Sequence, residues 1–128
     1  MSEVLVDTSV VIDYLRGQAD ARDYLEDLRS GANLATHVVV VAETLVGARD
    51  REEQQVIDSF FRPFRVRSVE STDGERSLDL FRSFHLAHGV EWLDCLIAAT
   101  CLRLRVPVAT LNDKHFSVFP DLDVQRPY

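Results

Sequence analysis

The sequence predicts an α/β fold, a three-layer α/β/α sandwich around a central, mostly parallel sheet. Short aliphatic runs alternate with longer segments of helical periodicity, which is the pattern of a parallel sheet covered by helices. The run WLDCLIAATCLRL at 92–104 is apolar on nearly every side, as expected of a helix in the middle of a domain. Acidic residues also follow predicted strands, where open α/β sheets place their functional sites.

Composition and length set the first bounds. The chain has 128 residues, of which 46% are hydrophobic and 27% charged, so we expect one globular domain over residues 1–128. It contains no apolar run of about 18 residues that could span a membrane, and its first residues, MSEVLVDTS, lack the basic lead of a signal peptide. Cys95 and Cys101 fit buried free thiols. These features predict a cytoplasmic protein.

The charge balance is acidic, with 14 Lys and Arg against 21 Asp and Glu and a net charge of -7. This argues against a protein that coats nucleic acid over a broad surface. It does not exclude a nuclease, because a metal site must itself carry carboxylates. It also suits a basic protein partner.

The N-terminal quarter is expected to contain two strands and two helices. Val4–Val6 is a short buried strand, and the run VVIDYLRG after it is a helical turn closed by Gly17. Asp20 can cap a helix that extends to about Leu28 and stops at Ser30 and Gly31. A second short strand follows at 33–35.

The run HVVVVAETLVGARD is ambiguous because its β-branched residues also suit a strand. We favour a helix from about His37, capped by Thr36, since four apolar or small residues would then share one face at spacings of three and four. These residues are Val39, Val40, Val46 and Gly47. A further helix is expected from Glu52 to Phe61, before Pro63.

The C-terminal half alternates in the same way. Residues 65–69 are expected to form a strand, and Ser71 to cap a helix over 73–88 that ends at Gly89. The side chains expected to face inward from this helix are Leu78, Phe81 and Phe84. The apolar helix at 92–104, the strand VPVAT, a loop over 111–119 and a short strand near 123–125 complete the chain.

Two of the acids that suggest a site follow strands. Asp7 comes directly after the first strand and Asp113 shortly after VPVAT. In a parallel sheet both strand ends lie at one edge, where ligand sites form. Each residue could instead serve only as a turn or helix-capping Asp.

Two other acids lie on predicted helices. Glu43 would lie in the middle of the apolar face formed by Val39, Val40, Val46 and Gly47. Since an unpaired Glu is rarely buried, this position suggests a functional carboxylate. A buried salt bridge with Arg49 or Arg16 is the alternative. Asp94 is in the first turn of the apolar helix, where the helix dipole favours an anion, so it could also be a simple N-terminal charge.

Taken together, these acids indicate a metal site. Helices that follow parallel strands begin at the edge where the strands end, so all four carboxylates can reach one crevice. Converging carboxylates repel and raise one another's pKa, which a hard divalent cation relieves. Mg²⁺ or Mn²⁺ with oxygen ligands suits phosphodiester hydrolysis, because the metal activates water and stabilises the developing charge.

Four stretches resemble a known family. They are VDTSVVIDYLRG at 6–17, VVAET around Glu43, HGVEWLDCLIAAT at 88–100 and PVATLNDKHF at 107–116. In this order they are similar to the PIN-domain ribonucleases, specifically the VapC toxins of bacterial toxin–antitoxin pairs. The resemblance implies a PIN-like fold, Mg²⁺- or Mn²⁺-dependent cleavage of RNA, and a cognate VapB-type antitoxin. We also expect a homodimer.

The resemblance also implies roles for individual residues. It implies an acidic site of Asp7, Glu43 and Asp94, with Ser9, Thr110 and Asn112 as supporting residues. Many relatives carry the fourth acid directly before the Phe of the last motif, where this chain has His115, and others carry it three residues before that Phe. The second pattern predicts Asp113 as the fourth catalytic and metal-binding acid.

Two other functions fit an α/β fold with acids at its strand ends. A response-regulator receiver also binds Mg²⁺, but it needs adjacent acids after its first strand and an Asp after its third, and this chain has neither. A PIN-like binding module that has lost its activity is the other alternative. Incubation with RNA, with and without divalent metal, distinguishes these functions.

Overall fold

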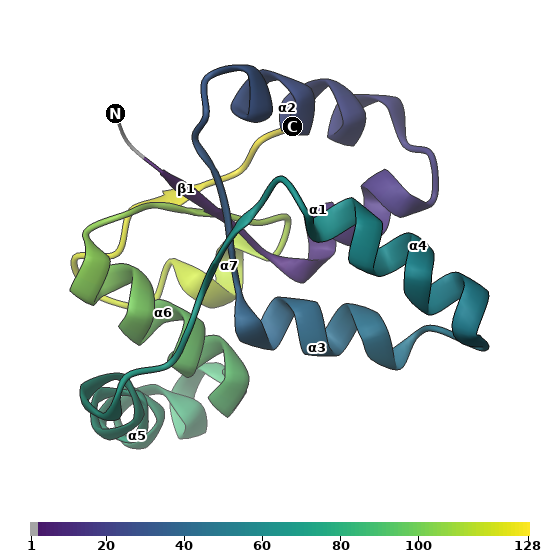
Figure 1. Ribbon diagram of the computed structural model, residues 1–128. Coiled ribbons are helices and arrows are strands. Elements are labelled where there is room, and N and C mark those ends of the chain that lie inside the picture. The colour runs from purple at the N-terminus through teal and green to yellow at the C-terminus, as the bar shows by residue number, and fades with distance from the viewer. Residues whose placement is uncertain (1–2) are drawn as a thin grey trace.

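A five-stranded, fully parallel sheet forms the centre of the molecule, seen in the computed structural model in Figure 1, which describes residues 3–128. The strand order is β3-β2-β1-β4-β5, so β1 is the central strand, with β2 and β3 on one side and β4 and β5 on the other. Val4 pairs with Leu34 of β2, and Leu5 with Val108 of β4. The strands are β1 (Val4–Val6), β2 (Leu34–His37), β3 (Arg65–Arg67), β4 (Val108–Ala109) and β5 (Val124–Gln125).

Helices flank this sheet on both sides, which confirms the predicted three-layer α/β/α class. In the view of Figure 1, α2 lies above the sheet, whereas α3, α5 and α6 lie below it. The helices are α1 (Thr8–Leu15), α2 (Ala19–Ser30), α3 (Val38–Val46), α4 (Arg51–Phe61), α5 (Ser71–His88), α6 (Trp92–Leu104) and α7 (Asp113–Phe116). Within the described residues no helix is both long and apolar enough to cross a membrane.

The predicted strands and helices are present, but the segment 111–119, predicted as a loop, contains the short helix α7. Three predicted helix caps are also wrong. Gln18, rather than Asp20, caps α2, because its side chain accepts a hydrogen bond from the Ala21 amide at 2.8 Å. Thr36 belongs to β2, where its hydroxyl donates to the Val6 carbonyl at 2.8 Å. The cap of α3 is therefore His37, whose Nδ1 accepts from the Val39 amide.

Helix α5 begins with the third corrected cap. Glu70 takes the place predicted for Ser71, and together with Asp73 it forms a capping box in which each side chain accepts from the other's backbone amide. Leu78 does not face inward as predicted, since 45% of it is exposed. Gly89 ends the helix in the left-handed conformation at φ 65°, as its position predicted.

Helix α6 has the bounds that the sequence predicted. Every residue from Cys95 to Cys101 is buried, so this helix is covered on all sides over two turns, and both cysteines are free. It packs along the length of α5. Because α6 cannot move without disturbing the core, its first turn presents Asp94 from a fixed position.

A buried polar network joins α3, α5 and α6. His37 Nδ1 accepts from a backbone amide, so the proton is on Nε2, which donates to the Thr100 hydroxyl at 2.9 Å. Thr100 lies 3.2 Å from a carboxylate oxygen of Asp73, and Arg103 donates two hydrogen bonds to the same carboxylate. Burial lowers the pKa of His37 to about 4, so the ring is neutral at pH 7.

We predict that Asp73→Asn lowers the free energy of unfolding by about 2–3 kcal/mol, because it removes the buried charge to which Arg103 donates two hydrogen bonds and leaves Arg103 only the more exposed Glu70, at 3.4 Å. Asp79→Asn is the matched control on the same helix. Asp79 also pairs with an arginine, Arg82, but both side chains are exposed, so the change should stay below about 0.5 kcal/mol. Urea unfolding of the two variants measures both values, and equal losses would contradict this role for the network.

Candidate active site

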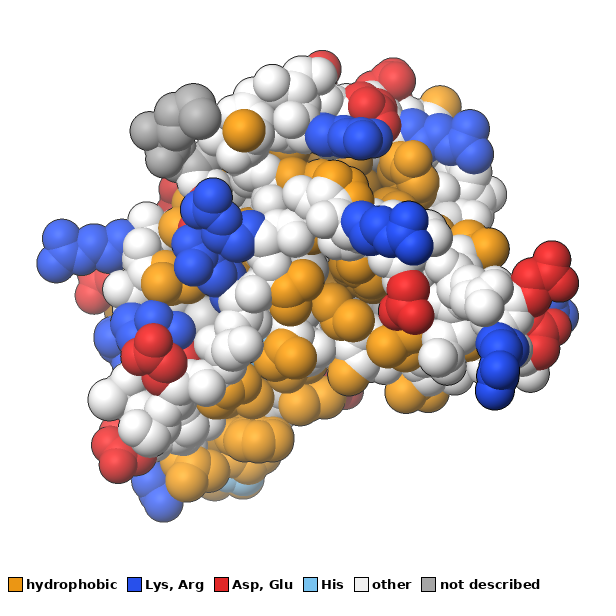
Figure 2. All heavy atoms as spheres, viewed as in Figure 1, with side chains coloured by type: hydrophobic (Ala, Val, Ile, Leu, Met, Phe, Trp, Pro, Cys, Tyr) orange, Lys and Arg blue, Asp and Glu red, His pale blue; other side chains and the backbone are white. Residues whose placement is uncertain are grey.

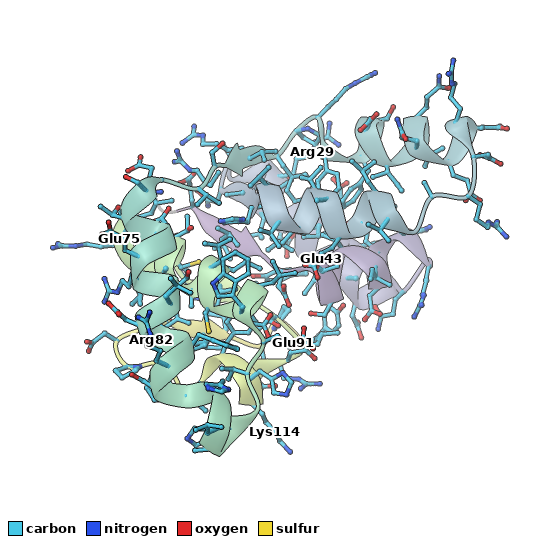
Figure 3. All side chains as sticks on the ribbon, turned by 90° about the horizontal axis from the view of Figure 1, so that it is seen from below. Arg29, Glu43, Glu75, Arg82, Glu91 and Lys114 are labelled. Carbon is cyan, nitrogen blue, oxygen red and sulfur yellow. The ribbon has the colours of Figure 1, made fainter. Side chains whose placement is uncertain are left out.

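A cavity of about 370 Å³ lies at the carboxyl edge of the sheet, where β1 ends and α6 begins. Figure 3 shows this side of the molecule, with Glu43 of α3 and Glu91 at the start of α6 on neighbouring elements. The cavity is lined by Asp7, Thr8, Ser9, Ile12, Glu43, Glu91, Asp94, Asn112 and His115. The fold thus brings together acids that are far apart in the sequence.

Asp7 is the most deeply placed of these acids, with only 4% of its surface exposed. Its amide donates to the Ala109 carbonyl at 2.9 Å, so its backbone is still tied to β4. Its carboxylate accepts hydrogen bonds from Thr110 at 2.8 Å and Ser9 at 3.3 Å. Burial raises the pKa of Asp7, although these hydrogen bonds oppose the shift.

The hydroxyls that contact Asp7 are themselves held in place. Ser9 Oγ accepts from the Leu111 amide at 3.0 Å, and Thr110 Oγ1 accepts from the Asn112 amide at 2.9 Å. Each hydroxyl therefore directs its proton at the carboxylate while it anchors the loop after β4. The structure puts Ser9 and Thr110 in contact with Asp7, whereas Asn112 lines the cavity.

Glu43 reaches the cavity from its rim and is exposed. Its carboxylate accepts a hydrogen bond from Thr8 Oγ1 at 3.0 Å. The apolar face predicted around it is not formed, because Val46 is 84% exposed and only Val40 is fully buried. The alternative salt bridge with Arg49 is absent too, since that arginine binds Glu53.

The electrostatic surroundings of Glu43 are unfavourable for its charge. Partial burial raises the pKa of Glu43, the hydrogen bond from Thr8 opposes this, and repulsion from Asp7 and Glu91 adds to it.

Asp94 projects from the first turn of α6 and is partly buried. Burial, followed by repulsion from Asp7 and Glu91, raises its pKa to about 6. His115 Nδ1 lies 4.0 Å from the Asp94 carboxylate. The metal-free site therefore holds negative charge at an energetic cost.

Asp113, predicted as the fourth acid, is not part of this cavity. It lines a neighbouring pocket of about 200 Å³, and Arg126 donates to its carboxylate at 2.9 Å. Asp113 is the first residue of the short helix α7.

Glu91 is the acid that we did not single out from the sequence. It lines the cavity with Asp94, from the position directly before α6. Its spacing of three residues from Asp94 was the available signal, since residues three apart at the start of a helix can share a face.

These side chains fit a hard divalent cation by the chemistry of their donors. Among residues 3–128, no three His, Cys, Asp or Glu side chains lie close enough to one another to surround an ion without other ligands. Mg²⁺ does not require such a cage, because it usually keeps several waters and binds protein through one or two carboxylates. Asp7 and Asp94 could supply these, and Glu43 could bind through water.

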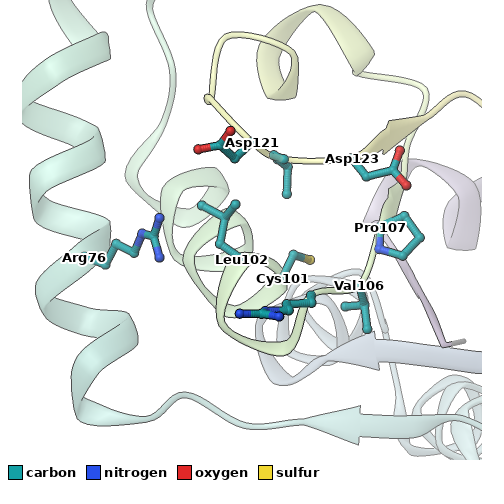
Figure 4. A pocket seen from close by; sticks show the side chains of 9 residues that line it. Arg76, Cys101, Leu102, Val106, Pro107, Asp121 and Asp123 are labelled. Carbon is teal, nitrogen blue, oxygen red and sulfur yellow. The ribbon is translucent and has the colours of Figure 1, made fainter.

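A second pocket of about 370 Å³, shown in Figure 4, does not have these features. Val106 and Pro107 in its wall precede β4, so it lies at the amino edge of the sheet. Its acids, Asp121 and Asp123, share it with Arg76 and Arg105. Their charges already balance, so this pocket does not call for a cation.

Comparison with known proteins identifies the family. The sequence profile of the PIN domain matches residues 4–122. The chain belongs to the PIN domain family. It is 38% identical to a protein named Ribonuclease VapC10 from Mycobacterium tuberculosis. The 120 aligned residues cover 93% of this chain and 90% of that relative. Ribonuclease VapC19 of the same organism is 35% identical over 129 residues, or 97% of this chain and 98% of the relative.

Solved structures agree with this PIN domain assignment. A toxin–antitoxin complex from Klebsiella pneumoniae contains a chain with a TM-score of 0.79 and 25% identity, covering 99% of this chain and 98% of that one. A DNA-bound VapBC from Salmonella typhimurium has a TM-score of 0.83 over the whole of both chains at 17% identity, which supports the fold alone. The family match also removes the receiver alternative.

We predict that Asp94→Asn stabilises the metal-free PIN domain at pH 7 by about 1–2 kcal/mol, because it removes a charge that burial disfavours and that neighbouring acids repel. The folded pKa near 6 exceeds the unfolded value of 3.8, so wild-type stability falls as pH rises through this window. The gain from the substitution should therefore grow between about pH 4 and 6 and then stay constant.

Urea unfolding in EDTA at a series of pH values measures this gain. Asp58→Asn, an exposed change on α4, is the control and should show no such dependence. Destabilisation by Asp94→Asn at pH 7 would contradict the proposed repulsion.

Proposed function

We propose that this PIN domain is a metal-dependent endoribonuclease and the toxin of a VapBC-type toxin–antitoxin pair. The observation that carries the proposal is the convergence of Asp7, Glu43 and Asp94 on one cavity at the carboxyl edge of the sheet. The chain's similarity to relatives named ribonucleases supports RNA as the substrate. The acids are intact, which disfavours an inactive PIN-like binding module.

The residues of this chain divide the work of phosphodiester hydrolysis. Asp7 and Asp94 would hold Mg²⁺ or Mn²⁺, which when bound lowers the pKa of water and stabilises charge on the phosphate. Thr110 and Ser9 keep the Asp7 carboxylate in one orientation. Glu43, which accepts a hydrogen bond from Thr8, would orient the attacking water and accept its proton as the water oxygen bonds to phosphorus. The bond from phosphorus to the ribose oxygen breaks in the same step, and that oxygen would take a proton from solvent.

We predict that Asp7→Asn and Asp94→Asn each lower the rate of RNA cleavage by about 100-fold or more, since removing a metal ligand removes activation of water. Glu43→Gln should lower it by about 10-fold or more. The assay is cleavage of RNA with Mg²⁺, with Mn²⁺ and with EDTA, which should stop the reaction. Asp58→Asn should cleave normally.

Cleavage by Asp7→Asn at the wild-type rate would contradict the assignment of the acids. No cleavage by the wild type with either metal would favour a binding module.

An apolar groove of about 450 Å³ is the proposed binding site for the VapB-type antitoxin. It lies between α1, α2 and α4, and Figure 2 shows apolar side chains on this face with charged residues around them. Its apolar lining is Tyr14, Leu15, Leu25, Leu34, Val56, Phe60, Pro63 and Phe64. An amphipathic helix can bind such a groove through its apolar face, and the net charge of -7 favours a basic partner segment.

We predict that Val56→Glu, which adds a charge to the groove, lowers affinity for the protein encoded by the adjoining reading frame by about 10-fold or more. Val66→Glu on the edge strand β3 is the control, because Val66 is also partly exposed but lies outside the groove. Co-purification and titration calorimetry with that protein measure binding. Equal effects of both substitutions would exclude the groove.

We also propose a homodimer. Val46 on α3 and Leu86 on α5 are 84% and 88% exposed, and a second copy could cover such side chains. Sedimentation velocity of the purified chain tests this, and a monomer at all concentrations would exclude it.

A further inference from the structure

We propose that Glu91 is the fourth carboxylate of the metal site and binds the cation directly or through one of its waters. The inference rests on the proposed metal-dependent function and adds a residue to it. It replaces Asp113, the acid predicted from the sequence. Four observations on these two residues support it.

The first observation is position. Glu91 and Asp94 line the same cavity as Asp7 and Glu43, whereas Asp113 lines a different pocket.

The second observation is that the carboxylate oxygens of Glu91 are available to bind a cation. Among the described residues, no side chain donates a hydrogen bond to Glu91 or forms an ion pair with it within 4.0 Å. Asp113 differs, because Arg126 occupies one of its oxygens at 2.9 Å. A ligand to a cation must have a free oxygen, and Glu91 meets this condition.

The third observation is that local structure does not require a glutamate here. Glu91 is the N-cap residue of α6, yet its side chain accepts no hydrogen bond from the helix. Ser, Thr, Asp and Asn are the side chains that cap helices well. A favourable interaction with the helix dipole is the remaining structural explanation, and it is worth little for an exposed side chain.

The fourth observation is that the backbone at Glu91 is held from both sides. Val90 before it is buried, and the indole of Trp92 after it donates to Ser77 Oγ of α5 at 2.9 Å. The glutamate is thus presented from a fixed point, while its flexible side chain can adjust to an ion.

The test is titration calorimetry of the full-length chain with Mn²⁺. Glu91→Gln should weaken Mn²⁺ binding by about 10-fold, the effect typical of losing a partner that supports a metal site. Asp113→Asn should stay within about twofold of the wild type. The first variant should fold normally, since Glu91 is exposed, and metal-free thermal melting checks this.

Glu91→Ser separates metal binding from helix capping. Serine is a good N-cap residue, so this variant should be at least as stable as the wild type without metal, yet it should lose Mn²⁺ affinity as Glu91→Gln does. Wild-type affinity in either Glu91 variant, or a larger loss in Asp113→Asn, would overturn the assignment of Glu91 but leave the proposed function intact. Absence of Mn²⁺ binding by the wild type would overturn both.

Discussion

Several carboxylates are confined at one edge of the sheet, where burial and, for Glu43 and Asp94, repulsion from neighbouring acids oppose their charges, and the rest of this structure depends on this constraint. Asp7 is buried, Asp94 is partly buried, and Glu43 and Glu91 approach them from the rim. Among the described residues that line this cavity there is no Lys or Arg, and only His115 could offset their charge. A fold that keeps like charges together in this way must be stabilised elsewhere, and it creates a strong preference for a cation.

The stabilisation comes from the elements behind the cavity. Helix α6 is buried on all sides over its middle turns, and the network of His37, Thr100, Asp73 and Arg103 connects it to α3 and α5. Glu43 lies on α3 and Asp94 on α6, so the contacts that stabilise the domain also help to fix the separation of these two carboxylates. The arrangement of the cavity therefore does not depend on a bound ligand.

Much of this could be predicted from the sequence, because the relevant signals are local. The all-round apolar run gave the bounds of α6, and acids after strands pointed to the carboxyl edge of the sheet. The incorrect predictions concern features that depend on tertiary contacts, such as which residue caps a helix or which side chain is buried. Thr36 looks like a helix cap, but its hydroxyl is used by β1, and Val46 fits an apolar stripe that the fold leaves exposed.

Asp113 and Glu91 show the same limit. Both are close in sequence to predicted site residues, but Glu91 lines the cavity with Asp7 and Asp94, whereas Asp113 lines a neighbouring pocket and pairs with Arg126. Residue spacing alone does not reveal this difference. Three acids of the cavity could thus be predicted from their relation to strands and helices, while the presence of Glu91 in it required coordinates.

The central claim is that these acids meet to hold one divalent cation. Anomalous diffraction from crystals soaked in Mn²⁺ tests it most directly. We predict a single strong peak between the carboxylates of Asp7 and Asp94, within reach of Glu43 through water. Well-diffracting crystals with no peak in this cavity, or with Mn²⁺ bound only beside Asp121 and Asp123, would contradict it.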